Sequence, residues 1–173
     1  MYHSTTYHSP VGVITLACSG GSLAGLWNEG QKYHGGSIPE AMAAKDDMPI
    51  FHQTKQWLDR YFAGGQPKPS ELPLAPIGSA FRQSVWEALC KIPYGEVVTY
   101  GGIAQQLGCK SSQAVGGAVG HNPISIIIPC HRVVGANGSL TGYAGGVRTK
   151  IRLLELEGVD VAGLFVPKKG TAL

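Results

Sequence analysis

Charged residues are scarce in this chain: they make up 14% of its 173 residues, whereas apolar residues make up 43%. A chain that can bury so much apolar surface is not expected to be disordered. No apolar stretch is long enough to cross a membrane, and no secretory leader is recognisable at the start, so we expect no membrane partner and a cytoplasmic location. Repeats and low-complexity tracts are also lacking. This composition predicts one globular domain or two small ones.

Closely spaced cysteines are absent too. No Cys-x-x-Cys pair occurs among the four cysteines, which argues against a zinc ribbon or a redox dithiol. An even count permits two disulfides, but a chain that can build a core is expected to keep reduced thiols. There is no Gly-x-Gly-x-x-Gly segment or other cofactor fingerprint either. We therefore expect no metal ion and no cofactor. The cysteines are Cys18, Cys90, Cys109 and Cys130.

The few charges are unevenly distributed. Residues 1–79 hold five basic and six acidic residues, whereas residues 80–173 hold nine and five. A positive second half suits a phosphate backbone, although so small an excess is also common in proteins that never meet DNA.

The apolar pattern predicts two parts. Residues 5–27 alternate like short strands and are interrupted at Ser9-Pro10 and at residues 19–21, whereas residues 50–62 have helical spacing. The segment 64–79 has four prolines and three glycines, which is typical of a linker. We therefore predict an α+β protein. A small sheet-plus-helix domain, residues 1–78, precedes a mainly helical domain, residues 79–173.

The second part contains a candidate helix-turn-helix. Ser79 is the expected cap of its first helix, which carries Phe81, Val85, Trp86 and Leu89 on one face. Farther along, residues 103–107 favour a helix, residues 108–110 a turn, and Ser111 the start of another helix. The same pattern also fits a plain helical hairpin packed on the core.

The last of these helices is poor in large side chains. Small residues in a helix interior suggest a surface that must be approached closely, either by a DNA groove or by another helix. Both explanations stay open. The small residues are Ala114, Gly116, Gly117, Ala118 and Gly120.

A thiol and an imidazole are adjacent at Cys130 and His131. The branched apolar run 124–128 precedes them and predicts a buried strand or packed segment that delivers Cys130 to a fixed place. A neighbouring histidine can activate a thiol as a nucleophile. A buried cysteine can also be an inert core residue.

Residues 114–146, AVGGAVGHNPISIIIPCHRVVGANGSLTGYAGG, decide between these alternatives. They resemble the active-site region of the O6-alkylguanine-DNA alkyltransferases, also called methylated-DNA–protein-cysteine methyltransferases. The resemblance extends from about Phe81 to Gly158. It implies direct reversal of DNA damage, in which the alkyl group of O6-alkylguanine passes irreversibly to Cys130 in a single turnover, with O4-alkylthymine as a further candidate substrate. The expected partner is duplex DNA, bound through its minor groove by a monomer that flips the damaged nucleotide.

The resemblance also assigns roles to individual residues. His131 would take the Cys130 proton through a water, Glu157 would orient His131, and Asn122 would bridge two backbone segments at a hinge. Tyr100 would donate to guanine N3. The carbonyls of Cys130 and Val133 would accept from the guanine amine, while a loop would cover the base and donate to O6. That loop contains Tyr143, Ala144 and Gly145. The DNA-binding helix would use Ser111, Gln113, Ala114, Gly117 and Ala118.

One position departs from the family pattern. Many relatives have an arginine where this chain has Gln113, and that arginine fills the gap left by the flipped nucleotide. Glutamine can still hydrogen-bond to the orphaned base, but it lacks the charge. We expect weaker DNA binding or slower flipping, with the chemistry intact.

Three other functions compete with this one. A non-catalytic alkylated-DNA binding protein would share the fold, but such proteins replace the reactive cysteine. A Cys-His hydrolase would turn over repeatedly and would need no DNA-binding helix pair. A helix-turn-helix regulator would need larger side chains on its second helix to distinguish bases.

Overall fold

The structure is a computed structural model that describes residues 1–140 and 146–165. Its contacts divide the chain into two units. The first contains Met1–Gly78 together with Pro123–Ile127, and the second contains Ser79–Asn122 and Ile128–Leu173. Among the described residues, no helix is both long and apolar enough to span a membrane.

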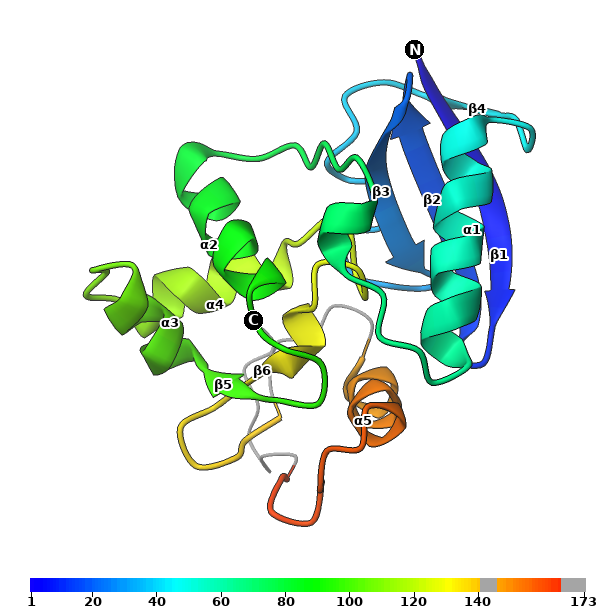
Figure 1. Ribbon diagram of the computed structural model, residues 1–173. Coiled ribbons are helices and arrows are strands. Elements are labelled where there is room, and N and C mark those ends of the chain that lie inside the picture. Colours follow the sequence, from blue (N-terminus) through cyan, green and yellow to red (C-terminus); the bar gives the residue numbers. More distant parts are fainter. Residues whose placement is uncertain (141–145, 166–173) are drawn as a thin grey trace. The chain divides into compact units, whose positions relative to one another are not determined.

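The first unit is built on a four-stranded sheet (Figure 1). Strands β1 (Tyr2–Ser9), β2 (Gly12–Ser19) and β3 (Ser22–Asn28) form an antiparallel meander, and β4 (Met42–Ala44) pairs in parallel with β1. The strand order is β3-β2-β1-β4. The two predicted interruptions coincide with the turns that join β1 to β2 and β2 to β3.

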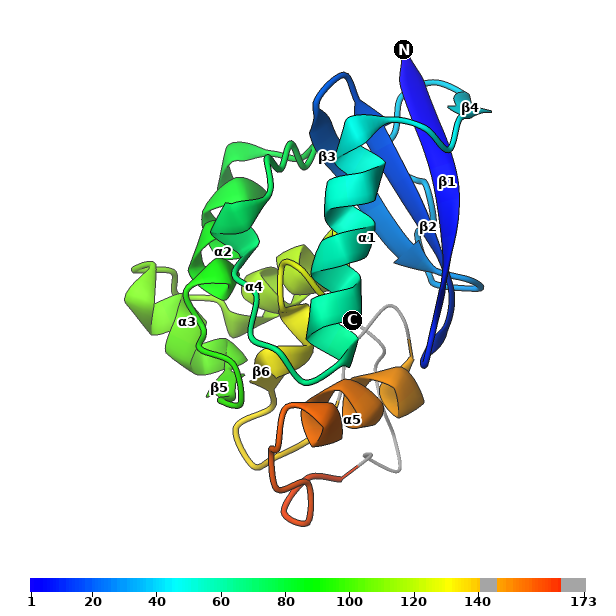
Figure 2. The ribbon, with the colours of Figure 1, turned by 45° about the vertical axis from the view of Figure 1, so that its right-hand side comes forward.

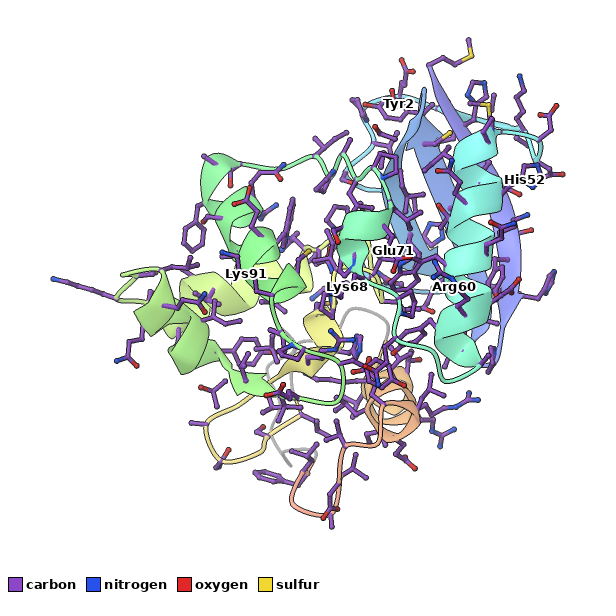
Figure 3. The ribbon with its side chains drawn as sticks, in the orientation of Figure 1. Tyr2, His52, Arg60, Lys68, Glu71 and Lys91 are labelled. Carbon is purple, nitrogen blue, oxygen red and sulfur yellow. The ribbon has the colours of Figure 1, made fainter. Side chains whose placement is uncertain are left out.

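Helix α1 (Pro49–Phe62) lies along one face of this sheet (Figures 1 and 2). Its buried residues follow a helical stripe, because an amphipathic helix places every third or fourth side chain on the same face. Trp57 of α1 also binds the segment that follows the helix, since its indole N–H donates to the Lys68 carbonyl at 2.8 Å. A short 3-10 helix, η1 (Pro69–Glu71), ends in an exposed ion pair between Arg60 and Glu71 at 3.0 Å (Figure 3). The stripe on α1 consists of Ile50, Phe51, Thr54, Trp57, Leu58 and Tyr61.

The second unit is mainly helical. Helix α2 (Ala80–Cys90) begins at the predicted cap, where the Ser79 hydroxyl accepts from the Arg82 N–H at 3.2 Å. The other helices are α3 (Tyr100–Gln106), α4 (Ser112–Gly120), α5 (Val147–Leu156) and the one-turn 3-10 helix η2 (Cys130–Arg132). Strands β5 (Val98–Thr99) and β6 (Val133–Val134) form a short parallel pair. The predicted α+β class is confirmed.

Helices α3 and α4 form the predicted helix-turn-helix. Thr99 caps the first helix and Ser111 the second, each accepting a backbone N–H with its hydroxyl. The Trp86 indole of α2 donates to the Ala118 carbonyl of α4 at 2.8 Å. Helix packing therefore explains part of the small-residue pattern, because Gly116 and Gly120 are buried. Phe81 was expected on the buried face of α2, but its side chain is 38% exposed.

Residues 123–127, which we call the strap, return to the first unit although the chain on both sides belongs to the second. The Leu26 N–H donates to the Pro123 carbonyl at 2.8 Å, and the Ser125 N–H donates to the Leu26 carbonyl at 3.1 Å. These two hydrogen bonds form one isolated β-bridge between Leu26 and Ile124. The apolar run is therefore a packed segment and not a strand.

We predict opposite effects on stability when alanine replaces two glycines. A Cβ at Gly117 would meet nothing within 4 Å, so Gly117→Ala should raise the free energy of unfolding by about 0.5–1 kcal/mol through helix propensity. A Cβ at Gly25 would lie 2.0 Å from the buried Trp27 ring, so Gly25→Ala should lower it by about 1–3 kcal/mol. Urea unfolding of both variants measures this. A destabilised Gly117→Ala variant would contradict the prediction.

Candidate active site

Two consecutive turns present the cysteine. Pro129 has a φ of −80° and a ψ of 66°, which is the geometry of an inverse γ-turn. This turn is closed by the Cys130 N–H, which donates to the Ile128 carbonyl at 2.7 Å. Cys130 then opens the 3-10 helix η2. Since proline fixes its own φ, the Pro-Cys pair holds the nucleophile candidate in one backbone position. The cysteine is 5% exposed.

Glu157 is the centre of a buried hydrogen-bond network. It caps the C-terminus of α5, and its side chain is fully buried. His131 Nε2 lies 2.6 Å from Oε2, which is a charge-assisted hydrogen bond when Glu157 is ionised. Arg132 donates to the same carboxylate through Nε at 2.8 Å and Nη2 at 3.1 Å. The Gly95 N–H donates to Oε1 at 3.1 Å. The carboxylate is therefore held by three residues from two segments of the chain.

The protonation states follow from these contacts. Burial by itself would raise the pKa of Glu157, but the hydrogen bonds from His131 and Arg132, together with the charge of Arg132, outweigh burial and hold that pKa below its ordinary range. Burial lowers the pKa of His131, against the opposing effect of Glu157. At neutral pH the site thus contains an ionised Glu157 paired with Arg132 and a neutral His131.

Lys150 is a residue of the candidate site that the sequence analysis missed. Its side chain is fully buried on α5, and its ammonium donates to the Val133 carbonyl at 2.5 Å. The ammonium also lies 6.0 Å from the centre of the Tyr100 ring. Burial lowers the pKa of Lys150 to about 8, while the charge of a Cys130 thiolate opposes that shift. A cation therefore lies close enough to Cys130 to favour its ionised form.

Lys150 and Glu157 share a detectable sequence signal. Positions 150, 153, 154 and 157 are spaced as one face of a helix, and Leu153 and Leu154 on that face are fully buried. Charged residues on a buried stripe require partners. The spacing therefore indicates a buried polar site even without a family resemblance.

Asn122 connects two backbone segments, as expected of a hinge residue. Its Nδ2 donates to the Ile128 carbonyl at 2.9 Å, and its backbone N–H donates to the Val119 carbonyl at 3.2 Å. The residue is 3% exposed. One side chain thus ties the end of α4 to the segment that carries Cys130.

The expected DNA-binding residues are divided between two faces of α4. Ser111, Gln113 and Ala114 are exposed at its first turn, and Gly117 is half-buried. Ala118 is only 2% exposed, so it belongs to the inner face that packs on α2. Tyr143, Ala144 and Gly145 lie outside the described residues. Within the parts of the chain that the structure describes, no cluster of three or more metal-ligating side chains occurs.

The burial of Lys150 predicts that the stability of the fold depends on pH. A base whose pKa is lowered on folding destabilises the fold below that pKa, and stability recovers as pH rises from about 8 toward the ordinary lysine value. The wild-type chain should therefore gain up to about 3 kcal/mol relative to Lys150→Met between pH 7 and pH 10. Urea unfolding of both chains across this range measures the difference, and exposed Lys91→Met is the control. A difference that stays constant with pH would refute the assignment.

Two family models match the chain. The ribonuclease-like domain of 6-O-methylguanine DNA methyltransferase matches residues 2–76, and the DNA binding domain of the same family matches residues 80–159. Together these matches span most of the chain and include every described site residue.

Individual relatives agree with the family models. The methylated-DNA–protein-cysteine methyltransferase of Haemophilus influenzae is 44% identical over 155 residues, which cover 88% of this chain and 84% of the relative. That of Methanosarcina acetivorans is 45% identical over 163 residues, which cover 91% and 99%. The crystal structure of Mycobacterium tuberculosis OGT in complex with DNA has a TM-score of 0.81 at 44% identity, and covers 90% of this chain and 92% of that one. The chain therefore belongs to the methylated-DNA–protein-cysteine methyltransferase family.

Proposed function

We propose that this protein repairs O6-alkylguanine in DNA by moving the alkyl group onto its own Cys130. The observation that carries the proposal is the buried thiol on η2, followed at once by a histidine whose Nε2 lies 2.6 Å from the Glu157 carboxylate. This Cys-His-acid arrangement belongs to nucleophilic catalysis. Family membership identifies the electrophile as the alkyl carbon bonded to guanine O6.

The reaction is a displacement at carbon. The Cys130 sulfur forms a bond to the alkyl carbon while the bond from that carbon to guanine O6 breaks, and the electron pair leaves with guanine. The thiol proton passes to His131 through a water. Because Nε2 faces Glu157, the proton is taken by Nδ1, and the resulting imidazolium is stabilised by the carboxylate. His131 is thus already neutral and ready to accept the proton, and the ionised Glu157 stabilises the charge that forms on the ring.

Three neighbours complete the chemistry. Lys150 stabilises the thiolate, since its ammonium is buried near Cys130. Tyr100 donates to guanine N3 and so stabilises the departing anion. The Val133 carbonyl already accepts from Lys150, and its second lone pair remains for the exocyclic amine of guanine.

Residues 79–173 carry both DNA binding and alkyl transfer in this proposal. The exposed first turn of α4 enters the minor groove, where little sequence information is available, and this suits a protein that must search all sequences. Open space around Gly117 supports a close approach of the groove. The damaged nucleotide is then flipped outward at a cost of a few kcal/mol in lost stacking.

The protein acts once and as a monomer. A thioether on Cys130 has no easy route to hydrolysis, so the modified chain is the end product, and O4-alkylthymine is a possible second substrate. All four cysteines are free. Because the reaction consumes a reduced thiol, the proposal places the protein in the reducing cytoplasm.

We predict that one methyl group per chain appears on Cys130 after incubation with a short duplex containing O6-methylguanine. Intact-protein mass measures the stoichiometry, peptide mass spectrometry locates the group, and Cys130→Ala should bind the duplex without gaining mass. Binding without modification of the wild-type chain would indicate a damage-recognition protein. Repeated turnover on an ester without modification would indicate a hydrolase.

We further predict that Gln113→Arg strengthens DNA binding or speeds repair. Gln113 is exposed at the first turn of α4, where a guanidinium would add phosphate attraction and stacking on the orphaned base. Fluorescence anisotropy with duplex DNA and a single-turnover repair assay measure both effects. The gain in affinity should shrink as salt is raised. Unchanged affinity and unchanged rate would remove Gln113 from the DNA interface.

A further inference from the structure

The strap is held at both ends and along its body. Asn122 and Ile128 flank it, and the Asn122 side chain joins them by its 2.9 Å hydrogen bond to the Ile128 carbonyl. The body pairs with Leu26 of β3 through the Pro123 carbonyl and the Ser125 N–H. All five residues of the strap are buried. The segment immediately before the Pro-Cys turn is therefore fixed by the first unit.

The backbone of the strap is strained at Ile126. This residue has a φ of 71°, in the left-handed region that a β-branched side chain rarely adopts. The Ile127 N–H donates to the Ser125 carbonyl at 2.8 Å across it, which is the pattern of a γ-turn with positive φ, a rare form. Such a conformation persists only when its surroundings hold it in place. Ile126 precedes Cys130 by four positions.

Gln31 supplies a side-chain hold on the same turn. Its Oε1 accepts from the Ser125 hydroxyl at 3.4 Å, from the Asn28 N–H at 2.9 Å and from Asn28 Nδ2 at 3.5 Å. Gln31 is 7% exposed and Ser125 is 1% exposed. One buried amide oxygen thus links the end of β3 to the first residue of the strained turn.

We propose that Gln31 is a positioning residue for Cys130: through Ser125 it holds the strained turn at Ile126, and this turn sets where the cysteine segment begins. The inference rests on the proposed function for the reaction that it serves. It also gives the first unit a part in the chemistry, because Gln31 and the strap both belong to that unit.

The test compares two substitutions of one side chain. Gln31→Met keeps the approximate size but removes the acceptor, whereas Gln31→Glu keeps an acceptor for the Ser125 and Asn28 donors. Methyl transfer from a saturating O6-methylguanine duplex should slow about threefold to tenfold in Gln31→Met, because small misplacements of a nucleophile are costly. Gln31→Glu should stay within about twofold of wild type, and DNA affinity should be unchanged in both. Gln56→Met, on the exposed side of α1, is the matched control.

A double-mutant cycle identifies the route. Ser125→Ala removes the donor, so it should slow transfer like Gln31→Met, and the double variant should be no slower than either single one. Additive losses would overturn the proposal. So would a wild-type rate in Gln31→Met, or equal slowing of Gln31→Met and Gln31→Glu in step with lost thermal stability, which would indicate a general effect on the fold.

A second readout does not depend on DNA repair. The rate at which iodoacetamide modifies Cys130, followed by peptide mass spectrometry from pH 6 to pH 9, reports how well the thiol is placed for activation. In Gln31→Met the midpoint of this profile should move to higher pH. If the wild-type chain transfers no methyl group, the proposed function fails but this profile still decides the role of Gln31. An unchanged profile would refute it.

Discussion

The buried carboxylate of Glu157 is the interaction on which the rest of the site depends. It accepts from the Gly95 N–H, from His131 and twice from Arg132. These donors come from two segments, the loop after α2 and the one-turn helix η2, which supplies two adjacent residues. A buried charge is tolerated only when it is paired and hydrogen-bonded, and removing one member of such a group leaves the others uncompensated. The network therefore fixes the conformation of η2, and with it the position of Cys130.

Charge balance explains how the site can stabilise a thiolate. Glu157 and Arg132 neutralise one another, and burial keeps His131 neutral. The ammonium of Lys150 interacts with the charge of a Cys130 thiolate, which is a counter-charge for this buried cation. Alkylation converts the thiolate into a neutral thioether and removes that counter-charge. The chemistry that repairs DNA thereby raises the electrostatic cost of keeping Lys150 charged and buried.

The sequence predicted those features that local rules determine. Turn residues marked the ends of the strands, apolar spacing located α1, and hydroxyl side chains marked the caps at Ser79 and Ser111. The resemblance supplied Cys130, His131 and Glu157, which the structure brings together. The backbone conformation of the strap could not be predicted. Branched apolar residues favour extended backbone, and the sequence of residues 124–128 does not indicate a positive φ at Ile126. Lys150 was missed because its role depends on its burial, which the sequence suggests only through the helical spacing of Lys150 with Leu153 and Leu154.

The two units differ in what they contribute to one nucleophile. The hydrogen bonds that set protonation all lie within the second unit, among η2, α5 and the loop at Gly95. The bonds that hold the body of the strap lie within the first unit, at β3 and Gln31. The charged groups of the second unit stabilise a thiolate at Cys130, whereas the strap determines where the segment that carries Cys130 begins. A reaction that requires both a thiolate and an in-line approach to carbon needs the two sets of contacts together. This gives a physical reason for the first unit, although the described charged residues of the candidate site, Arg132, Lys150 and Glu157, all belong to the second.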